Sequence, residues 1–374
     1  MLSGWMYVRP DAVLVWRDPV VARALSRYRA VMLDKKPAKF MVARLVEAPE
    51  KPEELGLEEL WRMHSELRPV FQEMLRDAWE GRLNAWRAER PRHSFLDVKA
   101  EIARRIVRRC MLCERRCLTD RTRGGRSICL LDDKAYVHSW FLHMGEEAPL
   151  VPSGTIFYGG CNFKCVFCQN WDVSQVGVRR GVPVSPKRLA EIQAELRRRG
   201  ARNINHVGGD PTPSLHVILD SLRYLEVNVP QLWNSNFYMS RESMELLIDV
   251  IDIWLPDFKY GNNRCALRLS GVPRYLEVVG RNLLLAAQHG DMIIRHLVLP
   301  GHLECCTKPV LRWIADNLPR GRILVNIMDQ YRPEHLVARY PQRWPDIARR
   351  PTYSEIAEAY RYADELGLNY RQVS

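Results

Sequence analysis

Three cysteines stand close together near the middle of the chain, in the stretch GTIFYGGCNFKCVFCQNW (residues 154–171). They are Cys161, Cys165 and Cys168, spaced C-x3-C-x2-C. Such short spacings let one loop wrap its thiolates around an iron–sulfur cubane. Because a [4Fe–4S] cluster has four irons, three thiolates leave one iron open, and an open metal position can chelate a small molecule. The alternatives are a zinc site completed from elsewhere in the chain, or accidental clustering.

A second set of cysteines precedes the first. It consists of Cys110, Cys113, Cys117 and Cys129, spaced C-x2-C-x3-C-x11-C. Four thiolates form a closed ligand set, which suits either an auxiliary [4Fe–4S] cluster or a structural zinc ion, and the sequence leaves both open. Either group would be anionic. Residues 101–130 contain nine arginines and three acidic residues, so the positive charge of this segment would offset it.

The remaining cysteines are Cys265, Cys305 and Cys306. The last two are adjacent in the stretch PGHLECCTKPV, after a predicted strand. One interpretation is a thiol that quenches or relays a radical, and the simpler one is a pair of free loop cysteines in a reducing compartment. We expect Cys265 to be structural.

Six short, β-branched runs must position these residues. They are GTIFYGG, NINHVGG, QLWNSN, IDIWLPDF, MIIRHLVLPG and RILVNIM, and amphipathic helical stretches separate them. One such stretch begins with Ser185 as its N-cap and Pro186 at the first helical position, and it ends before Gly200. Thr352 and Glu355 have the spacing of a capping box on the last helix. This alternation predicts an α/β fold with a parallel sheet, a partial (β/α)6 TIM-like barrel whose reactive groups collect at the C-terminal strand ends.

The length of 374 residues allows three parts. We expect a helical N-terminal region of unknown role (1–105), a cysteine-rich metal-binding segment (106–150) and a core barrel with a C-terminal helix (151–374). No apolar run approaches the roughly 20 residues that a membrane span needs, and the N-terminus lacks the apolar core of a secretory signal. The predicted location is therefore the cytoplasm, with no membrane partner, where cysteines are metal ligands or free thiols.

The net charge of +12 raises the question of nucleic acid. A composition bias toward arginine is the simpler explanation. The basic segment 101–130 contains no Trp, Tyr or Phe on which a base could stack. We therefore do not expect a nucleic-acid partner.

The motif CNFKCVFC, with Phe167 before its last cysteine, resembles the cluster loop of radical S-adenosylmethionine enzymes. Four further motifs follow in order: NINHVGGDPTP, IDIWLPDFKY, RHLVLPGH and NIMDQYRP. Together they resemble the pyruvate-formate-lyase-activating-enzyme-related branch of that superfamily, over roughly residues 106–340. Residues 1–105 lie outside the resemblance.

The resemblance implies a function for the open iron. It would bind S-adenosylmethionine, and an electron from the cluster would cleave this cofactor to methionine and a 5′-deoxyadenosyl radical. The radical would abstract hydrogen from a protein, for example from a glycyl residue, or from a small molecule. A reducing electron donor such as ferredoxin or flavodoxin is the implied partner, together with a protein substrate. The enzyme would be an oxidoreductase that resembles activating enzymes.

The resemblance also assigns residues. The cluster ligands are Cys161, Cys165 and Cys168, and Phe167 is expected near the adenine. The other residues implied to bind the cofactor end four successive strands: Gly208, Gly209 and Asp210; Asn234, Ser235 and Asn236; Asp257 and Lys259; and one of Arg295 and His296. The last two point to opposite faces of their strand, so at most one faces the cavity. His206 is expected either beside the cavity or packed within the sheet.

A hypothesis of another class remains. The chain would then be a basic zinc or iron–sulfur protein that binds RNA or a protein partner without radical chemistry. The open three-cysteine site argues against it, since a purely structural metal does not need a vacant position.

Overall fold

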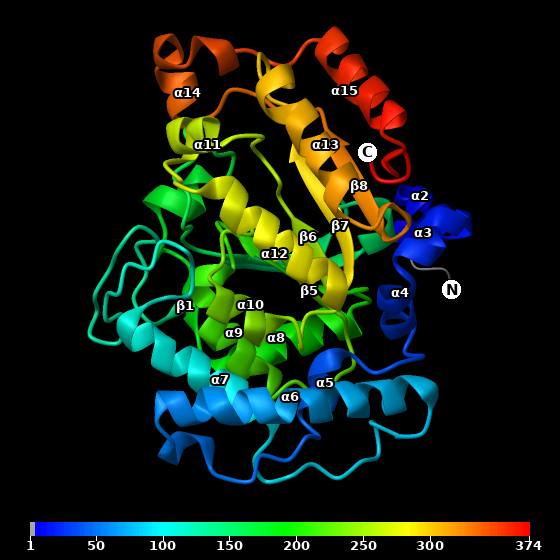
Figure 1. Cartoon of the computed structure of the whole chain (residues 1–374), viewed down its shortest axis with the longest axis vertical. Helices are drawn as coiled ribbons and strands as arrows, with labels where there is room; N and C mark the ends of the chain where they lie inside the picture. The colour runs from blue at the N-terminus through cyan, green and yellow to red at the C-terminus, as the bar shows by residue number, and fades with distance from the viewer. Residues whose placement is uncertain (1–3) are drawn as a thin grey trace.

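The computed structural model describes residues 4–374, and its centre is one eight-stranded sheet (Figure 1). The strand order is β3-β1-β2-β4-β5-β6-β7-β8. The strands are β1 (Ala135–His143), β2 (Ser153–Tyr158), β3 (Val182–Val184), β4 (Ile204–Gly208), β5 (Gln231–Ser235), β6 (Ile253–Pro256), β7 (Asp291–Leu297) and β8 (Ile323–Met328).

The six strands expected from the sequence are confirmed. They are β2 and β4 to β8, and each pairs in parallel with its neighbour. The sheet does not close, because β3 and β8 lie at its two edges. The fold is thus α/β with an open, mostly parallel sheet, as predicted.

Two strands were not expected. β1 pairs antiparallel with both β2 and β3 and extends the sheet on one side. It lies within the predicted cysteine-rich segment, residues 106–150, whose sequence shows little regular pattern. A register shift between Val137 and Ser139 interrupts the alternation by which a strand is identified.

Helices surround the sheet and build the N-terminal region (Figure 1). Among the described helices, none is both long and apolar enough to cross a membrane. The helices are α1 (Trp5–Val8), α2 (Asp11–Leu14), α3 (Pro19–Ala24), α4 (Ser26–Met32), α5 (Lys39–Ala43), α6 (Leu57–Glu80), α7 (Phe95–Ile106), α8 (Pro186–Arg198), α9 (Leu215–Leu222), α10 (Arg241–Leu247), α11 (Asn263–Ser270), α12 (Tyr275–His289), α13 (Lys308–Asn317), α14 (His335–Arg339) and α15 (Tyr353–Glu365).

Local signals in the sequence fix several helix ends. The hydroxyl of Ser185 accepts a hydrogen bond from the backbone of Arg188 and caps α8, as expected. Thr352 and Glu355 form the predicted capping box of α15. Each cap satisfies backbone N–H groups that have no partner within the helix, which is worth about 1 kcal/mol.

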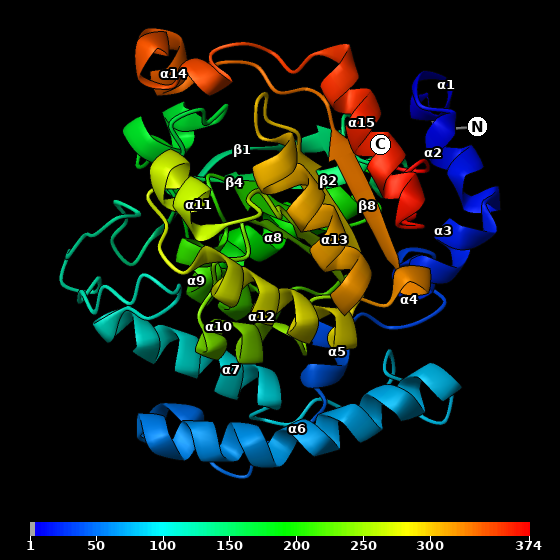
Figure 2. The same ribbon diagram turned by 45° about the horizontal axis from the view of Figure 1, so that its top comes forward.

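The N-terminal helices lie in two places. α6 runs along one outer edge of the molecule with α7 beside it, and their apolar residues belong to the same core as the helices around the sheet (Figures 1 and 2). α3 instead lies beside β8, on the side of the C-terminal helix α15 (Figure 2). The division at residues 105 and 150 stays a prediction.

At the N-terminal end of the parallel strands, the concave face of the sheet is filled by side chains from residues 16–28. Trp16, Val21, Leu25 and Tyr28 form an apolar cluster there with side chains from four strands. These strand residues are Leu232, Ile253, Leu255, Ile293 and Leu324. Because side chains alternate along a strand, the polar residues two positions further on share this face. This apolar cluster occupies the N-terminal end of the concave face, so the C-terminal end is the part that can hold a site.

Candidate functional site

A cavity of about 240 Å³ lies at the C-terminal edge of the parallel strands. It brings together residues from the ends of β2, β4, β5, β6 and β7. All the residues that the sequence predicted for the cluster and its cofactor line it: Cys161, Cys165, Cys168, Phe167, Gly208, Gly209, Asp210, Asn234, Ser235, Asn236, Asp257 and Lys259. Arg295 lines it as well.

The three cysteines lie on the loop that follows β2, and α11 holds this loop in place. The backbone N–H groups of Lys164 and Val166 donate to the carbonyls of Ser270 and Leu269, at 3.0 and 2.9 Å. The hydroxyl of Ser270 also donates to Cys165 Sγ at 2.9 Å. The C-terminal end of α11 thus fixes both the backbone and one sulfur of the loop.

Hydrogen bonds reach the other two sulfurs. Cys161 Sγ accepts from the backbone of Phe163 at 3.3 Å and from the side-chain amide of Asn236 at 3.6 Å. Cys168 Sγ and the hydroxyl of Ser174 lie 3.3 Å apart. Hydrogen bonds to cysteine sulfurs are one way in which a protein sets the reduction potential of an iron–sulfur cluster.

Burial acts on the thiols of the loop. It raises the pKa of Cys161 well above its ordinary value and that of Cys165 to about 11. A thiol with such a pKa keeps its proton at neutral pH, whereas a metal ligand must be a thiolate. Binding of a metal by these thiols would therefore release protons.

Two glycines let the end of β4 approach the end of β2. Gly208 has a φ of +119°, and a Cβ atom there would lie 2.2 Å from the backbone nitrogen of Tyr158. At Gly209 a Cβ would lie 2.1 Å from the carbonyl oxygen of Gly160. No side chain fits at either position, so backbone forms this wall of the cavity.

Asp210 links two strand ends. Its carboxylate accepts hydrogen bonds from the backbone N–H groups of Thr212 and Asn236, both at 2.9 Å. Burial raises its pKa to about 6, although these hydrogen bonds oppose the shift. Each oxygen keeps a second lone pair, so the carboxylate can still attract a positive ligand at neutral pH.

Asn234 carries a donor without an acceptor. Its side-chain nitrogen is buried in the wall of the cavity, and within residues 4–374 it has no hydrogen-bond partner. A buried, unpaired donor costs about 1–3 kcal/mol. This amide thus fits a ligand that supplies an acceptor, such as a ribose hydroxyl.

Asp257 and Lys259 form an ion pair in the cavity, with 2.7 Å between Lys259 Nζ and the carboxylate. Burial alone would lower the pKa of Lys259, but the carboxylate of Asp257 raises it, so the amine stays charged. Phe167 packs edge-on against Tyr331, 5.7 Å between ring centroids. The Asp257–Lys259 ion pair thus gives the cavity a charged wall, and Phe167 gives it an aromatic wall.

A buried ion-pair layer forms the floor of the cavity. Arg295 binds both carboxylate oxygens of Glu147, at 2.6 and 2.7 Å, and also pairs with Glu146. Asn326 donates to Glu147 at 2.8 Å and Asn205 to Glu146 at 2.9 Å. Sequence reasoning missed the two glutamates, which lie 148 and 149 residues before their partner.

Two histidines near the site are packed within the fold. His296 is buried between the carbonyl of Phe258 and the hydroxyl of Thr307, so Arg295 is the one of this adjacent pair that faces the cavity. His206 is buried against Tyr158 and Gln231. Burial lowers the pKa of both histidines to about 4, so both are neutral.

The second cysteine set also converges. All four of its cysteines, Cys110, Cys113, Cys117 and Cys129, line one small cavity. The buried guanidinium of Arg121 donates to Cys110 Sγ at 3.8 Å, which places one positive charge beside the thiols. Asn162 lines this cavity and its side-chain oxygen lies 3.8 Å from Cys161 Sγ, so the two cysteine sets are neighbours.

Comparison with known proteins gives the class. Residues 155–314 match the model of the radical SAM superfamily, whose members use a [4Fe–4S] cluster and S-adenosylmethionine. The chain belongs to this superfamily and is an enzyme of the radical SAM type. It is 44% identical over 350 residues to the uncharacterized protein MJ0674 of Methanocaldococcus jannaschii, covering 92% of this chain and 98% of that one.

Solved structures that align with part of this chain include SuiB of Streptococcus suis. Its complex with the precursor peptide SuiA aligns with a TM-score of 0.40 and 15% identity, and covers 56% of this chain and 46% of SuiB. Its complex with S-adenosylmethionine aligns with the same TM-score and 14% identity. The chain spans about half the length of SuiB.

The ion-pair layer predicts a pH-dependent loss of stability in Arg295→Met. The variant leaves two buried carboxylates without their cation, and we expect it to lower the free energy of unfolding by about 3–5 kcal/mol at neutral pH. Denaturant titrations measure the loss. Arg295→Lys keeps the charge without the two-point geometry and should lose less.

The sign of the pH dependence follows from Glu147. Burial raises the pKa of this carboxyl, but Arg295 and Asn326 outweigh burial and lower it. In the wild type Glu147 therefore stabilises the fold fully above its ordinary pKa, and this stabilisation is lost as the pH falls through the lowered pKa of the folded state. In Arg295→Met the hydrogen bond from Asn326 remains but the cation is gone, so we expect burial to raise this pKa. The deficit should therefore shrink as the pH falls from neutral toward 5, and an equal deficit at both pH values would contradict this role.

Proposed function

We propose that this radical SAM enzyme binds S-adenosylmethionine in the cavity at the strand ends and uses it to abstract hydrogen from a substrate. The observation that carries the proposal is the convergence of the three-cysteine loop, the glycine wall and the polar strand ends on one cavity. Cys161, Cys165 and Cys168 would hold a [4Fe–4S] cluster, and this cluster would supply the electron that cleaves the cofactor.

The chain's own residues would hold the cofactor. The backbone around Gly208 and Gly209 would accommodate the methionyl group, and the carboxylate of Asp210 would attract its positive charge. The unpaired amide of Asn234 would donate to the ribose, with Asn236 beside it. Phe167 would pack on the adenine.

The substrate is proposed from resemblance. The five ordered motifs favour the pyruvate-formate-lyase-activating-enzyme-related branch, whose reaction is hydrogen abstraction from a glycyl residue of a partner protein. A small molecule is the alternative substrate. Ferredoxin or flavodoxin would donate the electron, and a reducing cytoplasm would protect the cluster. The second cysteine set would hold either another cluster or zinc.

The proposal predicts cleavage of S-adenosylmethionine. After reconstitution with iron and sulfide without oxygen, the reduced protein should form 5′-deoxyadenosine, which chromatography quantifies. Cys168→Ala should form none above background, because it lacks one cluster ligand. Cys117→Ala is the matched control, since it removes a thiolate of the second set and leaves the first intact.

The same assay identifies the hydrogen donor. In extracts of cells grown on deuterated glycine, a glycyl target would transfer deuterium into 5′-deoxyadenosine. No product from wild type, despite a complete cluster and added extract, would contradict radical chemistry. It would then favour the alternative of a metal protein that binds RNA or a protein partner.

Asp210 predicts a pH dependence of cofactor binding. The carboxyl has a pKa of about 6, raised by burial, and only its ionised form attracts a cation. Affinity for S-adenosylmethionine should be constant above pH 6 and fall by up to about tenfold for each pH unit below it. Equilibrium dialysis of the reconstituted protein measures this. Asp210→Asn should bind more weakly without this step, and an unchanged step in the variant would exclude Asp210 as its cause.

A further inference from the structure

The three cysteines outside the two sets meet at one point together with a histidine. Cys265 lies on α11, whereas His302, Cys305 and Cys306 lie on the loop after β7 and the π-helical turn η7 (Leu303–Thr307). One ligand atom from each of the four lies within 4.8 Å of all the others. Cys265, His302 and Cys306 are buried, and Cys305 is partly exposed.

The distances fit one tetrahedral ion. Cys305 Sγ lies 3.9 Å from the sulfurs of both Cys265 and Cys306. His302 Nδ1 lies 3.4 Å from Cys305 Sγ and 3.6 Å from Cys306 Sγ. Zinc–sulfur bonds of about 2.3 Å and zinc–nitrogen bonds of about 2.0–2.1 Å, at tetrahedral angles, separate two sulfurs by about 3.8 Å and sulfur from nitrogen by about 3.6 Å.

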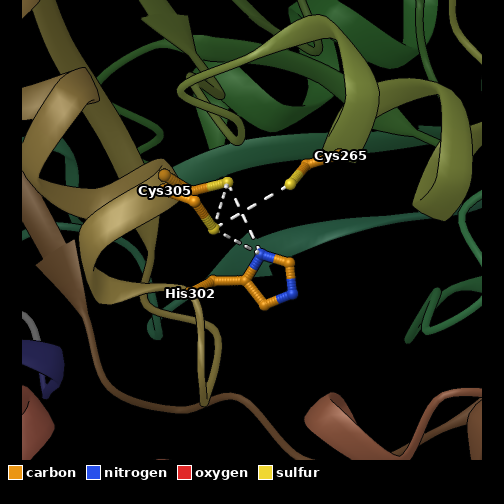
Figure 3. Close-up of side chains that lie close together, drawn as sticks. Cys265, His302 and Cys305 are labelled. Carbon is orange, nitrogen blue, oxygen red and sulfur yellow. Dashed lines mark hydrogen bonds between the residues drawn. The ribbon is translucent and has the colours of Figure 1, made fainter.

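The histidine ring is aimed at the thiols. Figure 3 shows a ring nitrogen of His302 facing Cys305, and Cys265 lies across the group from Cys305. The other ring nitrogen, Nε2, donates to the carboxylate of Asp346 at 2.9 Å, and Arg268 pairs with the same carboxylate. A carboxylate on Nε2 leaves the lone pair of Nδ1 free, which is the usual arrangement around a metal-bound histidine.

The local chain is built to bring these atoms together. Residues 302, 305 and 306 have the i, i+3, i+4 spacing that places side chains on one face of a helical turn. The side chain of Asn262, the N-cap of α11, donates to the carbonyl of Cys305 at 2.7 Å and to Cys265 Sγ at 3.3 Å. At Gly261 a Cβ would lie 2.8 Å from that carbonyl, so the two segments approach as closely as backbone allows.

We propose that Cys265, His302, Cys305 and Cys306 bind one zinc ion in a closed Cys3His site. Four protein ligands leave no vacant position, so the ion is structural. A cubane cluster attaches each cysteine to a different iron and would hold the sulfurs further apart than 3.9 Å. A disulfide would need sulfurs about 2.05 Å apart.

The ion would tie the loop after β7 to α11. This helix carries Cys265 near one end and Ser270, which holds the three-cysteine loop, at the other. Zinc would thereby fix the wall on which the cluster loop rests. The inference does not depend on the radical reaction, because it concerns residues that do not line the cofactor cavity.

Metal analysis of the full-length protein tests the proposal. Wild type, Cys305→Ser and His302→Ala are purified without oxygen from cells supplied with zinc and iron, and both metals are counted per chain. Each variant should lose one zinc equivalent relative to wild type and keep its iron. His302→Cys should retain zinc because it supplies a fourth thiolate. Cys168→Ser, the matched control, should lose iron and keep the zinc.

Two results would overturn the proposal. One is the same zinc content in wild type and Cys305→Ser, and the other is loss of iron in place of zinc. If the variants do not fold, zinc-edge X-ray absorption of the wild type decides, because the second cysteine set contributes only sulfur. Scattering from an imidazole ring supports the site, and sulfur ligands alone exclude it.

Discussion

Six parallel strands bring all their C-terminal ends to one edge of an open sheet. The side chains that fill the concave face below that edge determine where the cavity lies. The N-terminal helices fill its far end with apolar side chains around Tyr28. Above them lies the ion-pair layer of Arg295 with Glu146 and Glu147. Only the last layer remains open, and the cluster loop and the polar strand ends surround it.

The metal-ligating residues lie around this one edge. The first cysteine set follows β2, and the second lies beside it, with Asn162 between them. α11 connects the first set to the proposed zinc site through Ser270 and Cys265. The segments that carry the first two cysteine sets contain little helix or strand, so a bound metal would add to the hydrogen bonds that hold them.

Local signals in the sequence were enough to predict the parallel strands and the main cavity. Short β-branched runs ending in glycine, asparagine, aspartate or proline indicated the strands, and parallel topology then placed their C-terminal ends together. Ser185 and Thr352 marked helix starts because capping is decided within four residues.

The sequence could not predict contacts between distant segments. From the sequence alone, Glu147 would be expected at the surface, because its partner Arg295 lies 148 positions later in the chain. Cys265 and Cys305 are 40 positions apart, and no local sequence pattern around either cysteine indicates that the two lie close together. The strand β1 was missed because its bulge breaks the alternation of side chains, and because nothing in the local sequence indicates that this segment pairs with β2 and β3.

A cluster held by Cys161, Cys165 and Cys168 would leave one iron open, and we propose that S-adenosylmethionine binds to this iron. Electron–nuclear double resonance on the reduced, reconstituted protein tests it directly, using cofactor that carries an isotopic label in its amino group. We expect a coupling between the cluster and the labelled nitrogen. An intact cluster signal without that coupling, at saturating cofactor, would contradict the account.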